Sequence, residues 1–393
     1  MLRNITVGID LGTHQIKVVV VESVKENGRR QSRVIGVGVA ESRGLRHGYI
    51  VNTAEATESI AEAIHLAEKN SGMKIRKSFV AASGAGLQGF SYSTSILVSR
   101  SDMEITDFDV TKIAEVCEET LPANATQNKR ILHSIPISYK IDGKAILDKT
   151  PVGMKGSKLE VKMLFITCLE PHIVNLMEAV EKVGVEIVDV LAGPIASSFV
   201  TLSKTQKMAG CILTDIGRES TSIIVFENNV PVSLEVIQLG SNDITNDIAL
   251  GFKIPLEEAE NVKLGGVGAN SYPKKKLDEI IQARLYDMFE LIENHLKKIG
   301  RNELLPAGIM LTGGGASMQI LEDFAKNALK LPARIAVINQ NDQKSGMKDL
   351  RLAVAYGLCI LGMSKEEKIN LGLKNTLSNS SKKIFGWMKQ FLP

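Results

Sequence analysis

The chain has 393 residues and a mass of 42.7 kDa, which is too long for one small core and predicts two domains or one bilobal body. Hydrophobic residues make up 44% and charged residues 23%, with a mean hydropathy of +0.05, so the composition is that of an ordinary soluble globular protein and excludes a disordered chain. The formal net charge of +3 is too small and too evenly spread for a nucleic-acid binder.

The four cysteines are widely separated, with no C-x-x-C pair, which predicts reduced, buried thiols in the cytosol. The N-terminus lacks the apolar core of a signal peptide, and no apolar run reaches the roughly 18 residues that span a bilayer. The longest apolar run, residues 350–363, therefore predicts a buried helix.

In chain order, the segment from Ile5 to Glu22 predicts a strand, a tight turn and a second strand. Residues 54–70 follow with apolar side chains at the spacing of one helical face. Residues 210–226 then repeat the opening design, about 205 residues later. This alternation favours an α/β fold built from two related halves, with a ligand between them. Residues 307–316 predict a strand that enters a glycine turn, and residues 319–329 predict the next helix.

Two acidic turns follow buried strands, at Asp10 and at Asp215. An Asp followed by Gly and small hydroxyl residues suits a turn whose backbone N–H groups face a polyphosphate. The two carboxylates suit a hydrated Mg²⁺, which prefers carboxylates while keeping several waters, and Lys17 is within reach of a phosphate oxygen. Each turn alone is more typical of ordinary hairpin chemistry, but two copies with a third glycine turn favour a phosphate site.

The third turn, Gly313-Gly-Gly-Ala316, lets an adenine lie against bare backbone. Glu260 and Lys263 lie three residues apart on one predicted helical face, where they suit the hydroxyls of a ribose. The alternative for this pair, taken alone, is a solvated ion pair.

The three turns together resemble those of the actin, heat-shock chaperone and sugar-kinase ATPase superfamily. Five further segments add to the likeness: His133-Ser-Ile-Pro-Ile-Ser-Tyr, Pro151-Val-Gly-Met-Lys-Gly, Phe165-Ile-Thr-Cys, Ala192-Gly-Pro-Ile-Ala-Ser-Ser and Lys382-Lys-Ile-Phe. With them the chain resembles the FtsA family of bacterial cell-division proteins over essentially its whole length. The resemblance implies an α/β, bilobal actin-like ATPase fold with duplicated sheet subdomains, an FtsA-type inserted subdomain and a C-terminal amphipathic helix.

The resemblance also implies a division of the chain. Residues 1–85 and 163–208 would form the first lobe, interrupted by an inserted subdomain at 86–162 that is placed differently from actin's. Residues 209–240 and 306–363 would form the second lobe. Residues 241–305 would bind the C-terminal peptide of the tubulin-like ring protein FtsZ, and a flexible linker, 364–381, would lead to a membrane-targeting helix, 382–393.

Site residues are carried over motif by motif. The resemblance assigns the phosphates of ATP to Asp10, Gly12, Thr13, His14, Lys17, Asp215, Gly217, Ser220 and Thr221. It assigns the nucleoside to Glu260, Lys263, Gly313, Gly314, Gly315 and Ala316, and a water-mediated Mg²⁺ to Asp10 and Asp215. The chain departs from the pattern at Arg218-Glu219, where many relatives have small residues, and this departure concerns the terminal phosphate.

Hydrolysis needs a group that orients or deprotonates water at the terminal phosphate. In the chaperones and actin a Glu or Gln on the segment that links the lobes supplies it, whereas the matching stretch here, residues 190–197, has no carboxylate or amide. The loss of such a group typically costs about 10² to 10⁴ in rate. We therefore expect strong nucleotide binding with slow hydrolysis, unless Glu219 acts as the base. No catalytic residue is assigned.

The C-terminal segment carries an amphipathic pattern. Wound as a helix, it gathers its apolar side chains on one side, namely Ile384, Phe385, Trp387, Met388, Phe391 and Leu392, with Lys382, Lys383 and Lys389 opposite. Residues 364–393 hold six Lys and two Glu, and a Ser/Asn-rich stretch lies at 375–381. These features, with the resemblance, favour a helix in an anionic membrane interface over a short helix docked on the protein's own core.

Residues 282–298 predict an amphipathic helix in the expected FtsZ-binding subdomain. Arg284 on it is a candidate for the acidic FtsZ peptide, because a guanidinium forms two bonds with a carboxylate, and a solvated surface Arg is the alternative. The implied function is an ATP-binding protein that polymerises on the cytoplasmic face of the membrane at the division site and tethers FtsZ there, with other division proteins as further partners. An FtsA-like protein of a type IV pilus platform and a soluble sugar or acetate kinase remain as alternatives.

Overall fold

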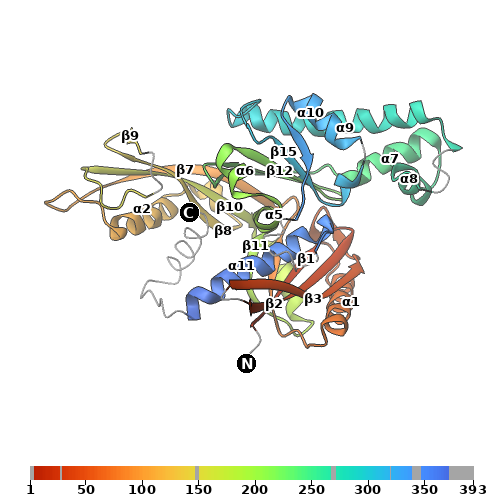
Figure 1. Cartoon of the computed structure of the whole chain (residues 1–393), viewed down its shortest axis with the longest axis horizontal. Coiled ribbons are helices and arrows are strands. Elements are labelled where there is room, and N and C mark those ends of the chain that lie inside the picture. The colour runs from red at the N-terminus through yellow and green to blue at the C-terminus, as the bar shows by residue number, and fades with distance from the viewer. Residues whose placement is uncertain are drawn as a thin grey trace.

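A computed structural model describes residues 4–26, 29–146, 150–266, 271–318, 320–338 and 347–370. Two five-stranded sheets form the body of the molecule, and a four-stranded sheet extends from one end (Figure 1). The predicted amphipathic helix, residues 382–393, lies outside the described residues.

The first sheet has the strand order β3-β2-β1-β6-β11. Its strands are β1 (Asn4–Leu11), β2 (Gln15–Glu26), β3 (Arg29–Glu41), β6 (Lys77–Ala82) and β11 (Glu186–Ala192). The first three strands pair antiparallel, while β6 pairs parallel with β1 and with β11. The predicted strand, turn and strand over residues 5–22 is confirmed, and Asp10 lies opposite Lys17 in its register.

The second sheet repeats this topology with the order β14-β13-β12-β15-β16. Its strands are β12 (Cys211–Ile216), β13 (Thr221–Glu227), β14 (Val230–Ile237), β15 (Ile309–Thr312) and β16 (Ala333–Ile335). Again the first three strands pair antiparallel, and the last two extend the sheet in parallel. The repeat in the sequence is therefore a repeated sheet, with β12 in the place of β1.

The third sheet has the order β7-β10-β8-β9 and forms the arm at the left of Figure 1. Its strands are β7 (Leu87–Leu97), β8 (Lys129–Ile141), β9 (Lys144–Ala145) and β10 (Lys158–Leu169), and α2 (Asp107–Glu119) packs on it. Strand β7 also contacts β14 of the second sheet, where a Cβ on Gly89 would lie 2.8 Å from the carbonyl oxygen of Leu234. The arm thus packs directly against the second sheet.

Helices lie on both sides of the two body sheets, and the short α3 contacts β8 of the third sheet. Their bounds are α1 (Thr53–Ser71), α3 (Ala123–Thr126), α4 (Glu170–Glu181), α5 (Gly193–Thr201), α6 (Lys204–Ala209), α7 (Ser241–Phe252), α8 (Leu256–Lys263), α9 (Lys274–Lys298), α10 (Leu321–Leu329) and α11 (Ala353–Asn370). Shorter elements are β4 (Leu45–Arg46), β5 (Tyr49–Ile50) and the 3₁₀ turns Gly314–Ser317 and Leu350–Leu352. Helix α5 contacts strands of both sheets and so joins the two halves.

The strands of the second sheet divide their side chains between two cores. Leu213 and Ile224 join the core that α5 shares with the first sheet, whereas Ile212 and Ile223 join a core on the opposite face, under α7, α9 and α10. This division follows from the alternation of side chains along a strand. Both faces of the second sheet are therefore buried, which holds its strand ends in place.

Local sequence explains where the helices begin and end. At α1 the side chain of Asn52 accepts hydrogen bonds from two N–H groups of the first turn, and Gly72 ends the helix at a φ of +69°. The predicted helix 54–70 is confirmed, as are the glycine turn and the buried helix in the run 350–363. Helix α11 continues to Asn370, so the start of the predicted linker, 364–381, is helical instead.

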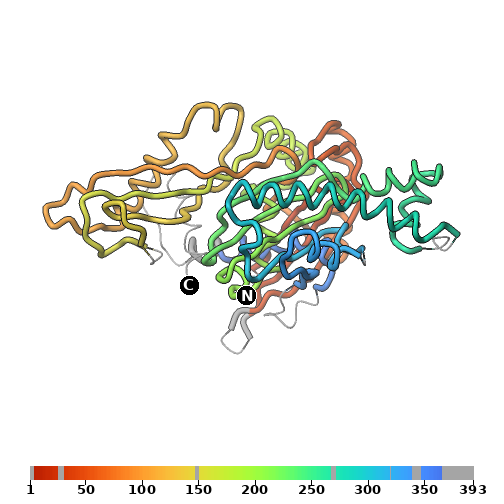
Figure 2. Tube along the Cα trace, turned by 90° about the horizontal axis from the view of Figure 1, so that it is seen from above, coloured from red at the N-terminus to blue at the C-terminus, as the bar shows by residue number. Residues whose placement is uncertain are grey.

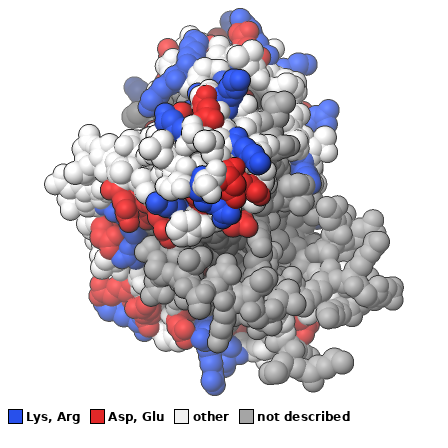
Figure 3. Space-filling view, turned by 90° about the vertical axis from the view of Figure 1, so that its left-hand side faces the viewer, with Lys and Arg blue, Asp and Glu red and all other residues white. Residues whose placement is uncertain are grey.

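The whole molecule is elongated, with the third sheet at one end and helices α7 and α8 at the other (Figure 2). Viewed from the end that carries the third sheet, the described basic and acidic side chains are intermixed rather than separated by sign (Figure 3). All four cysteines lie in the described part of the chain as buried thiols. Among the described helices, none combines the length and apolar character needed to cross a membrane.

The crossing of α5 and α11 depends on a glycine. A Cβ on Gly357 of α11 would lie 2.0 Å from the backbone oxygen of Ala196 in α5. Because backbone cannot yield as a side chain can, we expect Gly357→Ala to cost about 1–3 kcal/mol of unfolding free energy, measured by urea denaturation. The matched control is Gly251→Ala in α7, where the Cβ meets only the flexible end of Ile280. Equal losses in the two variants would contradict this packing.

Candidate functional site

A cleft of about 960 Å³ lies between the ends of the two body sheets, a volume that accepts a ligand of nucleotide size. Strand ends, the start of α5, α8 and the glycine turn line it. Almost all the residues predicted for phosphates and nucleoside meet there, namely Asp10, Gly12, Thr13, His14, Lys17, Asp215, Gly217, Ser220, Glu260, Lys263, Gly313, Gly314, Gly315 and Ala316.

The two acidic turns have the same geometry. A Cβ on Gly12 would lie 2.8 Å from the carbonyl oxygen of Gln15, and a Cβ on Gly217 would lie 2.9 Å from that of Ser220. Each glycine therefore lets its turn close tightly after the strand. Because β1 and β12 hold equivalent places in their sheets, the two turns face the cleft from opposite sides.

Thr221 is the exception among the predicted residues. Its side chain is fully buried, and its hydroxyl donates to the carbonyl oxygen of Leu239, 2.8 Å away, so it belongs to the core rather than the cleft. The next residue, Ser222, lines the cleft, because successive side chains of a strand point to opposite faces. The repeat contained the signal for this correction, since Ser222 lies opposite Asp215 as Lys17 lies opposite Asp10.

The two aspartates differ in their surroundings. Asp10 forms an ion pair with Lys17, with 2.8 Å between Asp10 Oδ2 and Lys17 Nζ. Burial and then the charge of Asp10 raise the pKa of Asp215 to about 6, against the opposing effect of Lys17. Gly313 packs against Asp215 so closely that a Cβ there would overlap its Oδ1 atom. Two facing carboxylates of which one is destabilised suit a divalent cation, which would relieve their repulsion.

The donor set sets a limit on that cation. Among the described residues, no group of three or more His, Cys, Asp or Glu side chains is arranged as a metal site. Asp10 and Asp215 would therefore hold a metal with water as most of its ligands, which fits Mg²⁺.

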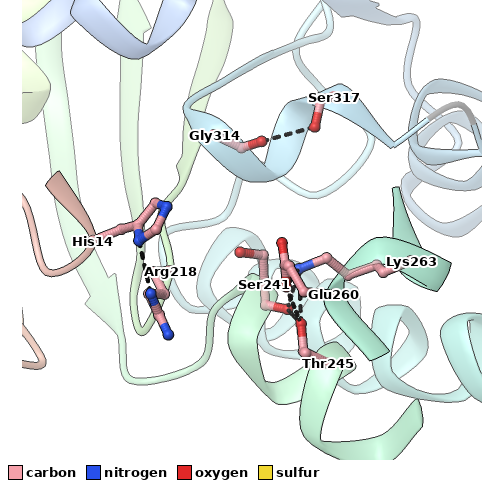
Figure 4. A network of polar contacts seen from close by, with 8 residues as sticks. All are labelled: His14, Arg218, Ser241, Thr245, Glu260, Lys263, Gly314 and Ser317. Carbon is pink, nitrogen blue, oxygen red and sulfur yellow. Dashed lines mark hydrogen bonds and ion pairs between the residues drawn. The ribbon is translucent and has the colours of Figure 1, made fainter. Parts of the chain in front are cut away.

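On the far side of the cleft, Glu260 and Lys263 belong to a compact network with Thr245 and Ser241 (Figure 4). The ammonium of Lys263 donates to Glu260 at 2.7 Å and to Thr245 at 2.9 Å, and its side chain is only 3% exposed. Burial raises the pKa of Glu260, but the hydrogen bonds from Lys263 and Thr245 outweigh it and hold that pKa below its usual value. Lys263 is therefore a buried anchor, whereas the side chain of Glu260 stays 45% exposed at the cleft. Sequence reasoning missed Thr245.

Two contacts join the second acidic turn to the first half of the molecule. Arg218 Nη1 lies 2.7 Å from His14 Nδ1, and the two side chains point toward each other in Figure 4. The Glu219 carboxylate accepts from the backbone N–H of His47 at 2.6 Å. Glu219 is not among the residues that line the cleft, and its carboxylate is held at the turn between β4 and β5. This position does not favour Glu219 as a base.

Two further predictions concern residues away from the phosphate turns. The segment 190–197 enters the cleft through Gly193 and Pro194 at the start of α5. Arg284 lies on α9, where its guanidinium pairs with Asp247 and with Asp287. The predicted membrane residues, Lys382 to Leu392, lie outside the described part of the chain.

Sequence comparison decides the family. The model of the cell division protein FtsA matches residues 212–357, and that of the SHS2 domain inserted in FtsA matches residues 84–167. The cell division protein FtsA of Borreliella burgdorferi is 31% identical over 98% of both chains, and that of Bacillus subtilis is 32% identical over 90% of this chain and 82% of its own. The chain belongs to the FtsA family of cell division proteins.

Solved structures agree with an actin-like fold. The chain superposes on the PilM-PilN type IV pilus biogenesis complex with a TM-score of 0.65 at 18% identity, covering 91% of this chain and 98% of the other. MreB5 of Spiroplasma citri bound to ADP gives a TM-score of 0.53 at 14% identity, covering 93% and 98%. The predicted α/β actin-like fold with an inserted FtsA-type domain is confirmed, and the SHS2 match at 84–167 lies close to the expected 86–162.

The raised pKa of Asp215 yields a stability prediction. Above pH 6 the ionised Asp215 carboxylate costs the folded state free energy. As the pH falls from 6 to about 4, Asp215 takes up a proton in the folded state before it does so in the unfolded chain, so this cost to the unfolding free energy disappears. In buffer without metal or nucleotide we expect Asp215→Asn to raise the unfolding free energy on the order of 1–3 kcal/mol at pH 7.5 and hardly at pH 4. Urea denaturation at both pH values measures it.

The matched control is Asp10→Asn, which breaks the ion pair with Lys17 and should bring no such gain. A gain for Asp215→Asn that is the same at both pH values would contradict the charge explanation.

Proposed function

We propose that the chain binds ATP with Mg²⁺ in the cleft and acts as a nucleotide-dependent scaffold of the division ring. The observation that carries this proposal is the pair of equivalent Asp-x-Gly turns that face one another across a cleft of nucleotide size. Membership of the FtsA family supports the role in cell division.

In this proposal each part of the cleft has one task. The backbone N–H groups of the turns at Gly12 and Gly217 bind phosphate oxygens, and Lys17 adds a charge. Asp10 and Asp215 hold the hydrated Mg²⁺, which neutralises phosphate charge when bound. The glycine turn from Gly313 lies against the adenine.

At the nucleoside end of the cleft, hydrogen bonds hold the side chain of Glu260 in one position, which a pair of surface charges would not do. Lys263 and Thr245 both contact Glu260 Oε2, which leaves Oε1 to accept from ribose hydroxyls. Because Lys263 is buried and hydrogen-bonded, it fixes Glu260 in place before the ligand arrives. Slow hydrolysis fits this site, since residues 190–197 bring no carboxylate or amide to the cleft.

The scaffold role adds three interactions. Residues 382–393 would lie in an anionic membrane surface on its cytoplasmic side, residues 241–305 would bind the C-terminal peptide of FtsZ, and copies of the chain would polymerise. One short helix binds lipid weakly, whereas many helices on one filament bind strongly through effective concentration. Polymerisation and membrane attachment therefore reinforce each other.

Membrane attachment is tested by co-sedimentation with anionic vesicles, with and without ATP and Mg²⁺. We expect ATP to increase the bound fraction of the full chain at least several-fold, and truncation after Ser381 to abolish binding, because the lipid-binding residues are removed. The truncated chain should still bind nucleotide, which serves as the control. Equal sedimentation of both forms would contradict the assignment of the tail.

The FtsZ contact is tested at Arg284, whose Nη1 contact to Asp287 is long, at 3.3 Å, and leaves that side of the guanidinium for a peptide carboxylate. We expect Arg284→Gln to weaken an acidic FtsZ C-terminal peptide about tenfold in fluorescence anisotropy. Lys297→Gln on the same helix removes an exposed cation from another site and is the matched control. Unchanged affinity in Arg284→Gln would leave that residue without a role in binding.

A further inference from the structure

Arg218 occupies an unusual place for a permanent cation. It stands in the second acidic turn, between Gly217 and Ser220, and its guanidinium reaches across the cleft to His14 in the first turn. It therefore lies between the two groups of N–H donors that the proposed function gives to the phosphates.

The contact to His14 is a weak one in electrostatic terms. A guanidinium has only donors, so His14 Nδ1 must accept, and the imidazole must be the neutral tautomer with its proton on Nε2. Burial and then the charge of Arg218 lower the pKa of His14, in agreement with this assignment. A phosphate oxyanion is a stronger partner for a guanidinium than a neutral imidazole, because both partners are then charged.

Three other cations of the cleft have carboxylate partners, and a fourth, Lys348, is exposed. Lys17 pairs with Asp10, Lys263 pairs with Glu260, and Arg351 pairs with Asp349. Arg218, by contrast, meets an imidazole. It can turn to an incoming anion without breaking an ion pair of that kind.

The backbone beneath Arg218 is fixed while its side chain is exposed. Its carbonyl oxygen accepts from Asn242 at 2.8 Å, and that of Gly217 accepts from Ser241 at 2.9 Å, both at the start of α7. A Cβ on Gly240 would also clash with the Arg218 carbonyl oxygen. The guanidinium can thus change its position while the backbone of Arg218 stays fixed.

We propose that Arg218 is the residue that distinguishes a nucleoside triphosphate from a diphosphate, by leaving His14 to bind the terminal phosphate. This inference rests on the proposed binding of ATP in the cleft. It gives a function to the one basic residue of the second acidic turn, residues 215–221.

The alternative is that Arg218 only holds the two turns together. The structure offers a matched control for that alternative, because the neighbouring Glu219 also joins the second acidic turn to the first half of the molecule, through the backbone N–H of His47. Loss of a simple bridge would weaken every nucleotide alike, whereas loss of a phosphate contact would weaken only the triphosphate.

The experiment titrates the full chain, Arg218→Ala and Glu219→Ala with ADP and with a non-hydrolysable ATP analogue, both with Mg²⁺, by calorimetry. We expect Arg218→Ala to weaken the triphosphate analogue about 10- to 100-fold and ADP by less than about threefold. Glu219→Ala should change both affinities by a similar factor. Thermal unfolding of each variant checks that its fold is intact.

Three results would overturn the inference. One is a ratio of triphosphate to diphosphate affinity that Arg218→Ala leaves unchanged, with both ligands still bound. Another is an equal change of that ratio in Glu219→Ala, which would assign the effect to the contact between the turns. The third is a parent chain that binds neither nucleotide, which would remove the proposed function as well.

Discussion

The placement of Asp10 and Asp215 opposite one another in the cleft is the constraint on which the rest of the molecule depends. Burial and the charge of Asp10 make Asp215 costly to ionise, so the two carboxylates stay together only if a rigid structure holds them, and here each stands at the end of a buried central strand. Both faces of the second sheet are covered, and α5 packs against both sheets. The stability lost at the cleft is thus offset by the cores around it.

The same rigidity connects the cleft to distant parts of the chain. Strand β14 lies at the edge of the second sheet and contacts β7 of the inserted sheet at Gly89 and Leu234, where the backbones are too close for a side chain. The first residues of helix α7 lie beside the second acidic turn, where the backbone N–H groups of Ser241 and Asn242 donate to the carbonyl oxygens of Gly217 and Arg218. The second turn is therefore joined through close backbone contacts to the helices of the expected FtsZ-binding subdomain, and its sheet is joined to the arm.

Periodic and repeated patterns predicted much of this fold, and contacts between distant residues escaped prediction. The strand, turn and strand around Asp10 and its copy around Asp215 follow from local apolar runs and glycines. Thr221 was misplaced because the motif was carried over without the strand's alternation, although the pairing of Lys17 with Asp10 pointed to Ser222. The contact of Glu219 with His47 joins residues 172 positions apart, and no local pattern encodes such a meeting.

The charges of the cleft give a reason for a cation in the second turn. Before any ligand binds, the charges of six cleft side chains sum to zero: the carboxylates of Asp10, Asp215 and Glu260 and the cations of Lys17, Lys263 and Arg218. Of the three cations, Arg218 contacts a neutral imidazole. A triphosphate with Mg²⁺ carries more negative charge than a diphosphate with Mg²⁺, and the extra charge lies at its end. In the proposed function, a scaffold that hydrolyses ATP slowly gains most from a residue that binds the terminal phosphate. Its assembly on the membrane is then determined by which nucleotide is bound rather than by the rate of turnover.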